Sequence, residues 1–149
     1  MKTGGCLCGA VRFTGEGAAS GVHVCHCEQC ARWTGGPAMC VEFADGIAIE
    51  GPVTWYASSD WAERGFCSTC GSTLFYRLKD GAYMNVGAGF IDDRAGLAPI
   101  NQHIFIDRKP SFYDFAGDAP RLTGEEFLAQ LSNGTPDVRR NRLLRARTF

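Results

Sequence analysis

Short stretches in which apolar and polar residues alternate recur along the chain, and such stretches are typical of β-strands. Valine, isoleucine and aromatic residues fill alternate positions in several of them, and turn residues such as glycine and aspartate separate one from the next. The pattern predicts strands at 10–15, 21–25, 38–43, 47–51, 53–58, 73–78, 82–89 and 103–107. Many short strands with regular turn signals favour an all-β fold built from sheets or a barrel.

A helical pattern appears only toward the C-terminus. Thr123 and Glu126 have the spacing of a capping box, and the apolar residues that follow share one helical face. Gly134 is placed to end this helix. A second helix is predicted from Thr135, with Pro136 at its first helical position. One or two short C-terminal helices are therefore expected beside the sheets.

The length and charge of the chain narrow its organisation. A chain of 149 residues fits one domain, which we place at 1–134, followed by an arginine-rich tail at 135–149. The formal net charge of −1 gives no general attraction to nucleic acid or to an anionic membrane. No aromatic residues are interleaved with the tail arginines, so nucleic-acid binding is not expected. These arginines are Arg139, Arg140, Arg142, Arg145 and Arg147.

The cellular setting follows from two features. No run of 18 apolar residues is present, and the N-terminus lacks the apolar core of a secretory signal. We therefore expect a cytoplasmic protein without a membrane span. In a reducing cytoplasm, the eight cysteines favour metal binding over disulfides. The sequence leaves the oligomeric state open, and a homodimer is one possibility.

Four cysteines in two short-spaced pairs predict a structural zinc site. Cys6 and Cys8 form a C-x-C pair, and Cys67 and Cys70 form a C-x-x-C pair followed by Gly71. A tetrahedral zinc with Zn–S bonds near 2.3 Å places its sulfur ligands roughly 3.8 Å apart. Turns of these lengths can bring both sulfurs of a pair to one metal. The alternative is that all four are buried thiols without a metal.

Three further cysteines, Cys25, Cys27 and Cys30, lie within the stretch "CHCEQC". Three protein ligands with an open fourth position are typical of a catalytic zinc, which lowers the pKa of a thiol that binds it. A fourth protein ligand that closes the site is an equal alternative. The candidates for that ligand are His23, Cys40 and His103.

Two histidines, one inside this stretch and one much later in the chain, are not expected to act as catalytic bases. His26 stands between two of the cysteines, so in an extended segment its side chain points away from theirs. His103 opens an apolar strand and is expected to be a hydrogen-bonded structural histidine rather than a catalytic base.

Several segments of the chain, in this order, resemble the glutathione-dependent formaldehyde-activating enzyme family, which includes centromere-protein-V-like domains. Each segment alone is unspecific, and the resemblance rests on their combination. The segments are "GGCLCGAVRF" (4–13), "VCHCEQCARWTGG" (24–36), "YASSD" (56–60), "RGFCSTCGSTLFYR" (64–77) and "HIFIDRKPSFYDF" (103–115).

The resemblance implies an Mss4-like fold of several coiled antiparallel sheets, stapled by zinc. It also implies two zinc ions per chain. Their ligands would be Cys6, Cys8, Cys67 and Cys70 for the structural zinc, and Cys25, Cys27 and Cys30 for the second zinc, where catalysis is expected.

The function implied is that of a carbon–sulfur lyase. Such an enzyme acts on adducts of glutathione, or of another small thiol, with an aldehyde such as formaldehyde, and the family reaction gives S-hydroxymethylglutathione. Arg32, Arg64 and Arg77 are candidates for binding the carboxylates of glutathione. Two other functions stay open: a zinc-stabilised binding or scaffold module, and a glutathione carrier in which Cys27 forms a mixed disulfide without turnover.

Overall fold

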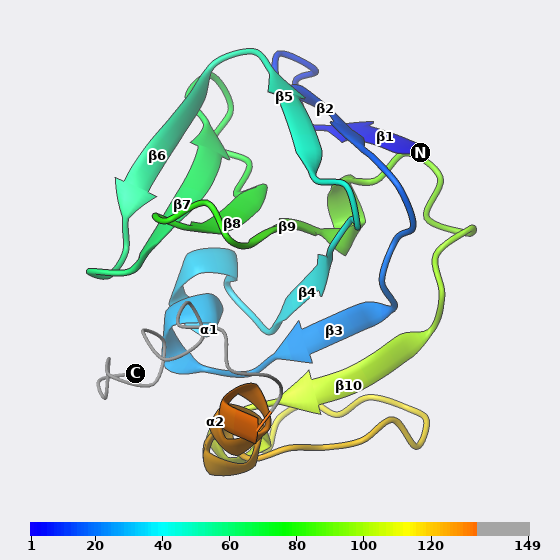
Figure 1. Ribbon diagram of the computed structural model, residues 1–149, viewed down its shortest axis with the longest axis vertical. Helices are drawn as coiled ribbons and strands as arrows, with labels where there is room; N and C mark the ends of the chain where they lie inside the picture. Colours follow the sequence, from blue (N-terminus) through cyan, green and yellow to red (C-terminus); the bar gives the residue numbers. More distant parts are fainter. Residues whose placement is uncertain (134–149) are drawn as a thin grey trace. The chain divides into compact units, whose positions relative to one another are not determined.

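The computed structural model of the chain describes residues 1–133, which belong to two compact units. The first unit contains residues 1–22 and 39–99, and the second contains residues 23–38 and the described residues from 100 onward. Ten strands and two α-helices occur in the described part of the chain (Figure 1). The expectation of an all-β fold with a short C-terminal helix is confirmed.

One sheet of the first unit has three antiparallel strands in the order β1-β2-β5. These are β1 (Lys2–Gly5), β2 (Arg12–Gly15) and β5 (Ile47–Glu50). Phe13 on β2 pairs with Ile49 on β5, and its ring is buried. The alternation of buried and open positions along β2 is the pattern that a sheet with one covered face requires.

The other strands of the first unit follow the order β4-β9-β8-β7-β6, and each neighbouring pair is antiparallel. A short 3₁₀ helix, η1 (Ala88–Phe90), follows β9. The strands are β4 (Ala38–Val41), β6 (Val53–Ala57), β7 (Ala62–Cys67), β8 (Phe75–Leu78) and β9 (Met84–Gly87).

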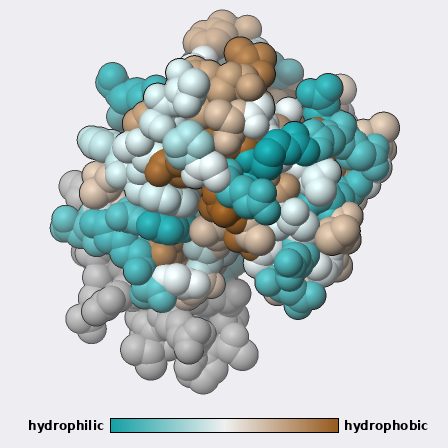
Figure 2. Space-filling model, turned by 90° about the horizontal axis from the view of Figure 1, so that it is seen from above, coloured by the Kyte–Doolittle hydropathy of each residue, from teal (hydrophilic) through white to brown (hydrophobic). Residues whose placement is uncertain are grey.

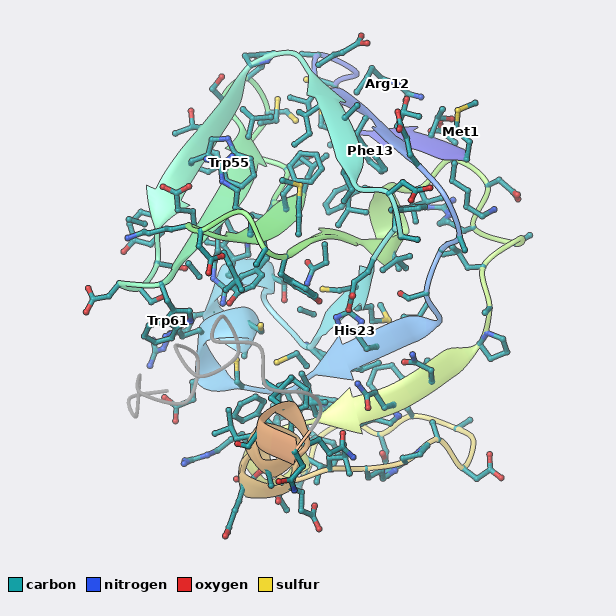
Figure 3. All side chains as sticks on the ribbon, in the orientation of Figure 1. Met1, Arg12, Phe13, His23, Trp55 and Trp61 are labelled. Atoms are coloured by element: carbon teal, nitrogen blue, oxygen red, sulfur yellow. The ribbon has the colours of Figure 1, made fainter. Side chains whose placement is uncertain are left out.

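An aromatic cluster forms the core of the first unit. The rings of Phe13 and Phe75 meet edge to face with centroids 5.7 Å apart, and the ring of Trp55 stacks on Phe75 at 6.1 Å. Figure 3 shows Phe13 and Trp55 extending from β2 and β6 into the interior of this unit. Gly4 on β1 lies against the Phe13 ring, where any Cβ would collide with it. The close approach of β1 to the cluster therefore requires glycine.

The second unit is built around β3 (Val22–Cys25) and β10 (Ile100–Ile104), which are neighbours and run in the same direction in Figure 1. Helix α1 (Glu28–Thr34) follows β3 directly, and a 3₁₀ helix, η2 (Ile106–Arg108), follows β10. Helix α2 (Gly124–Asn133) is the last described element.

The N-terminus of α2 has the predicted capping box. The backbone N–H of Glu126 donates to the Thr123 hydroxyl at 3.2 Å, and the backbone N–H of Thr123 donates to the Glu126 carboxylate at 2.7 Å. The ring of Phe127 packs on Phe105 with centroids 5.8 Å apart, which fixes α2 to the segment after β10. The predicted helix end at Gly134 and the whole tail at 135–149 lie outside the described residues.

Among the predicted strands, the one at 103–107 differs most from the structure in its bounds. Strand β10 begins earlier, at Ile100, and ends at Ile104 because Phe105 adopts the left-handed conformation with φ 57°. A phenylalanine in this conformation is strained, and burial of its ring against Phe127 offsets that strain. The chain then turns into η2 instead of continuing as a strand.

Two strands and one α-helix were not predicted. Strand β1 (KTGG) contains two glycines, and β7 (AERGFC) has charged residues next to each other, so neither shows clear alternation. Helix α1 has only seven residues, starts from a cysteine instead of a usual capping residue, and ends at Gly35 in the left-handed conformation. These elements are formed by their tertiary surroundings more than by local preference.

The surface of the described part carries scattered apolar side chains. Figure 2 shows hydrophobic residues interspersed with hydrophilic ones over the face in view. None of the helices within residues 1–133 has the length and apolar character needed to cross a membrane. The largest exposed apolar side chains are Met1, Leu7, Met39, Tyr56 and Phe112.

The aromatic cluster predicts a sharp contrast between two phenylalanines. Phe13 is 2% exposed and Phe112 is 85% exposed, so the same truncation removes very different amounts of packing. Phe13→Ala should lower the free energy of unfolding by about 3–5 kcal/mol. Phe112→Ala, the matched control, should change it by no more than about 0.5 kcal/mol. Urea unfolding followed by circular dichroism measures both, and equal losses would contradict the assignment of the core.

Candidate functional site

The four-cysteine group consists of Cys6, Cys8, Cys67 and Cys70, whose sulfurs all lie within 4.8 Å of one another. The Cys6 and Cys8 sulfurs are 3.5 Å apart, and the Cys8 and Cys67 sulfurs are 3.9 Å apart. These separations are close to the roughly 3.8 Å between sulfur ligands of a tetrahedral zinc. The group could hold a metal ion with no position left open.

Two similar turns position the two cysteine pairs of this group. Gly9 follows Cys8 with φ 79°, and its backbone N–H donates to the Cys6 carbonyl at 3.1 Å. Gly71 follows Cys70 with φ 75°, and its backbone N–H donates to the Cys67 carbonyl at 2.8 Å. Glycine tolerates this left-handed conformation, which lets the chain double back so that two sulfurs face the same point.

Hydrogen bonds orient the sulfurs of the four-cysteine group. The backbone N–H of Val11 donates to the Cys6 sulfur at 3.2 Å. The Ser72 hydroxyl accepts from the Leu7 backbone N–H at 3.1 Å, which leaves its own proton for the Cys70 sulfur 3.2 Å away. Hydrogen bonds from Ser72, through its hydroxyl and its backbone, lower the pKa of Cys70 to about 5. A thiolate ready to bind metal at neutral pH follows from this support.

The three-cysteine group consists of Cys25, Cys27 and Cys30, whose sulfurs also lie within 4.8 Å of one another. Cys25 ends β3, Cys27 is the N-cap of α1, and Cys30 lies in the first turn of that helix. The backbone N–H of Cys30 donates to the Cys27 sulfur at 3.4 Å. All three residues are buried. The seven-residue helix α1 therefore gathers the three sulfurs at the end of one strand.

The chemistry of this group suits a cation. The neighbouring sulfurs of Cys27 and Cys30, together with burial, raise the pKa of the Cys25 thiol well above its usual range. Three thiolates this close repel one another strongly in a buried place. A bound divalent cation reverses that balance, because it stabilises each thiolate directly. The three-cysteine group could therefore hold a metal ion, with three protein ligands.

The candidates for a fourth ligand lie in different places. In the described part of the second unit, no other histidine, cysteine or acidic residue joins the three-cysteine group within the same distance. His23 lies on β3 (Figure 3), and His103 lies on β10, where its Nδ1 is bound to another histidine. Cys40 lies on β4 of the first unit, and its role as a ligand stays a prediction.

A hydrogen-bonded chain of side chains starts at His26, between two of the cysteines. Its Nδ1 lies 2.8 Å from the Tyr113 hydroxyl, and its Nε2 lies 3.1 Å from Nδ1 of His103. Burial, followed by repulsion from the positive charges of His103, Lys109 and Arg121, lowers the pKa of His26 to about 4. Burial also lowers the pKa of His103. Both shifts favour the neutral imidazole, which carries one proton.

Tyr113 is held from several sides. The Lys109 ammonium donates to the Tyr113 backbone carbonyl and lies 4.9 Å from the centre of its ring. The ring stacks on His26 with centroids 5.8 Å apart. Arg121 binds the Asp114 carboxylate at 2.9 Å and the Phe115 carbonyl at 3.0 Å, which fixes the residues that follow. The Tyr113 hydroxyl thus has a defined place beside His26.

Sequence reasoning missed Tyr113, which lies 87 positions from His26 along the chain. No local spacing links the two, and only the pairing of β3 with β10 brings their segments together. Two arginines proposed as glutathione ligands already have partners in the first unit. Arg77 binds the Glu63 carboxylate at 2.8 Å and stacks over Trp55, and Arg64 is buried and lies over a tyrosine ring.

Comparisons with known proteins support the family resemblance and the fold. The family model described as "Glutathione-dependent formaldehyde-activating enzyme" matches residues 1–108. A Schizosaccharomyces pombe protein named as an uncharacterised lyase is 29% identical over 130 residues, which cover 86% of this chain and 95% of that protein. The crystal structure of a Rhodobacter sphaeroides protein superposes with a TM-score of 0.50 at 23% identity. That match covers 66% of this chain and 98% of the other, and it supports the fold alone.

The hydrogen bond from Ser72 predicts a measurable effect on metal affinity. Ser72→Ala removes the only side-chain hydroxyl bound to a sulfur of the four-cysteine group in the described residues, and should weaken zinc binding there by about 10–100-fold. Ser68→Ala is the matched control, because the Ser68 hydroxyl lies in the same loop but donates to the Pro52 carbonyl. Competition with a chromogenic chelator measures both affinities. An equal effect of the two variants would show that Ser72 does not support the metal ligand.

Proposed function

Because the chain belongs to the glutathione-dependent formaldehyde-activating enzyme family, we propose that it is a zinc-dependent carbon–sulfur lyase. Its substrates are adducts of glutathione, or of another small thiol, with an aldehyde such as formaldehyde, and it acts in the cytoplasm. The observation that carries the proposal is the three-cysteine group, which has three buried sulfurs and no fourth ligand from the described second unit. The lyase name of the Schizosaccharomyces pombe relative supports the same class of reaction.

The two cysteine groups have different roles in this proposal. The four-cysteine group would bind a structural zinc, since all four tetrahedral positions are filled by protein. The three-cysteine group would bind the second zinc and leave one position for the sulfur of a substrate. When bound there, zinc lowers the pKa of a coordinating thiol and holds it as a thiolate at neutral pH.

The bond changes of the reaction balance without an oxidant or reductant. In the direction of synthesis, the lone pair of the thiolate sulfur forms the new carbon–sulfur bond to the aldehyde carbon. The π pair of the carbonyl group moves to oxygen, which takes up one proton. In the lyase direction, the hydroxyl proton leaves, the carbonyl re-forms and the sulfur departs as a thiolate. The burial of Cys25, Cys27 and Cys30 keeps bulk water away from that sulfur.

Zinc counting with native mass spectrometry tests the site assignment. The full chain should carry two zinc ions and bind one glutathione, and Cys27→Ser should carry one zinc ion, stay folded and bind none. S-methylglutathione is the matched control ligand, because its sulfur cannot become a thiolate. Two zinc ions without any affinity for glutathione would favour the scaffold function instead. Loss of one zinc ion in Cys40→Ser would identify Cys40 as a fourth ligand and would contradict an open site.

Turnover itself is measured by exchange spectroscopy. NMR would follow the exchange among glutathione, formaldehyde and S-hydroxymethylglutathione, and the zinc-loaded chain should speed this exchange in proportion to its concentration. Cys27→Ser should leave only the spontaneous rate. A chain that binds glutathione but does not change the exchange rate would favour the carrier function, and other aldehydes and small thiols would then be tried in the same assay.

A further inference from the structure

We infer that a cavity in the first unit, beside the hairpin between β8 and β9, binds an α-amino acid head group, in which an ammonium and a carboxylate are carried on one carbon. The cavity has a volume of about 320 Å³, which is enough for a small molecule. None of the residues that line it belongs to either cysteine group, so the inference goes beyond the proposed function and does not depend on it. The lining side chains include Glu63, Arg77, Leu78, Lys79, Tyr83 and Met84.

The charged part of the cavity is an ion pair held by the sheet. Glu63 on β7 stands directly opposite Arg77 on β8, and Met84 on β9 stands opposite Arg77 on the other side. Nε of Arg77 donates to Oε2 of Glu63 at 2.9 Å, and Nη2 lies 2.8 Å from the same oxygen. The guanidinium carbon lies 3.6 Å from the centre of the Trp55 ring on β6 (Figure 3). Strand pairing and the stacked ring therefore fix the pair before any ligand binds.

This pairing leaves one charged atom of each partner for a ligand. Among residues 1–133, neither Oε1 of Glu63 nor Nη1 of Arg77 makes a hydrogen bond, and the two side chains are 24% and 35% exposed. The two atoms belong to one bonded pair, so a single small molecule can reach both. An ammonium group suits the anionic Oε1, and a carboxylate suits the N–H groups of the cationic Nη1.

Lys79 adds a second positive charge to the cavity. It follows the last residue of β8, and its backbone N–H donates to the Trp61 carbonyl at 2.9 Å, which fixes the start of the hairpin. Its ammonium group makes no hydrogen bond with the residues that the structure describes. The charges of Lys79 and Arg77 favour a carboxylate, and the charge of Glu63 favours an ammonium. The cavity therefore matches a ligand that carries both charges better than a simple anion or cation.

The remaining wall of the cavity is apolar and comes from Leu78, Met84 and the ring of Tyr83. The Tyr83 hydroxyl donates to the Glu42 carboxylate at 2.8 Å and accepts from the Asn85 amide at 3.1 Å, so the ring is held in place. An apolar or flexible group attached to the head group suits this wall. Two sources share that chemistry: a free amino acid, and the γ-glutamyl end of a compound such as glutathione. An ordinary peptide N-terminus lacks the carboxylate on the same carbon.

The first test varies the ligand and leaves the full, zinc-loaded chain unaltered. L-Leucine and γ-glutamylglycine are titrated against the ¹⁵N-labelled chain, and shifts in the amide signals of Lys79, Tyr83 and Met84 report binding. N-acetyl-L-leucine lacks the ammonium and L-leucinamide lacks the carboxylate, so each should bind about 10–100-fold more weakly than L-leucine.

The same titrations separate the two sources of the head group. Tighter binding of γ-glutamylglycine would assign the cavity to γ-glutamyl compounds, and tighter binding of L-leucine would assign it to free amino acids. Shifts from neither compound would overturn the inference, and so would equal affinity for L-leucine and its two blocked forms. Either result would leave the proposed function intact, because γ-glutamylglycine and L-leucine contain no sulfur.

The second test alters the charges of the cavity and uses the tighter of the two ligands. Glu63→Gln keeps the shape of the side chain but removes the charge that faces the ammonium, and should weaken binding about 10–100-fold. Lys79→Met should weaken it about 2–5-fold, as expected for an exposed charge. Asp92→Asn is the matched control, because it removes a carboxylate from an ion pair with Arg12 outside the cavity. Thermal unfolding checks that all three variants stay folded, and a folded Glu63→Gln chain that binds as tightly as Asp92→Asn would refute the role of Glu63.

Discussion

Mutual repulsion among closely spaced thiolates is the constraint on which the rest of this structure depends. Two groups of cysteines bring their sulfurs within 4.8 Å, and one of them joins Cys6 and Cys8 to Cys67 and Cys70 across most of the first unit. Such crowding is unfavourable for charged sulfurs unless a cation lies among them. The turns at Gly9 and Gly71 and the short helix α1 are therefore best understood as devices that hold ligands in place before a metal binds.

The two groups meet this constraint in different ways. The four-cysteine group draws hydrogen bonds from Val11 and Ser72 and has a ligand for each tetrahedral position. The three-cysteine group is more deeply buried, and the backbone N–H of Cys30 donates to the Cys27 sulfur. A site with complete coordination and its own supporting donors suits a structural role. A buried site that lacks one ligand suits the capture of a sulfur from outside.

Much of this could be predicted from the sequence because the signals were local. Alternation found most strands, the spacing of Thr123 and Glu126 found the cap of α2, and the short-spaced cysteines found both groups. What could not be predicted depends on contacts between distant segments. The end of β10 is set by the left-handed Phe105, which is stabilised by packing against Phe127. The chain from His103 through His26 to Tyr113 joins three segments that no spacing relates.

The stretch "CHCEQC" serves two sides of the second unit because its first residues are extended. Side chains alternate along an extended backbone. The sulfurs of Cys25 and Cys27 therefore lie together with that of Cys30, while His26 points toward His103 and Tyr113. A single residue of slip would place His26 among the sulfurs and a cysteine in the hydrogen-bonded chain. The local conformation that builds the three-cysteine group therefore also fixes the imidazole that is hydrogen-bonded to Tyr113. The placement of the cysteine sulfurs and the hydrogen bonds of His26 are thus consequences of one backbone segment, and a change in either is expected to disturb the other.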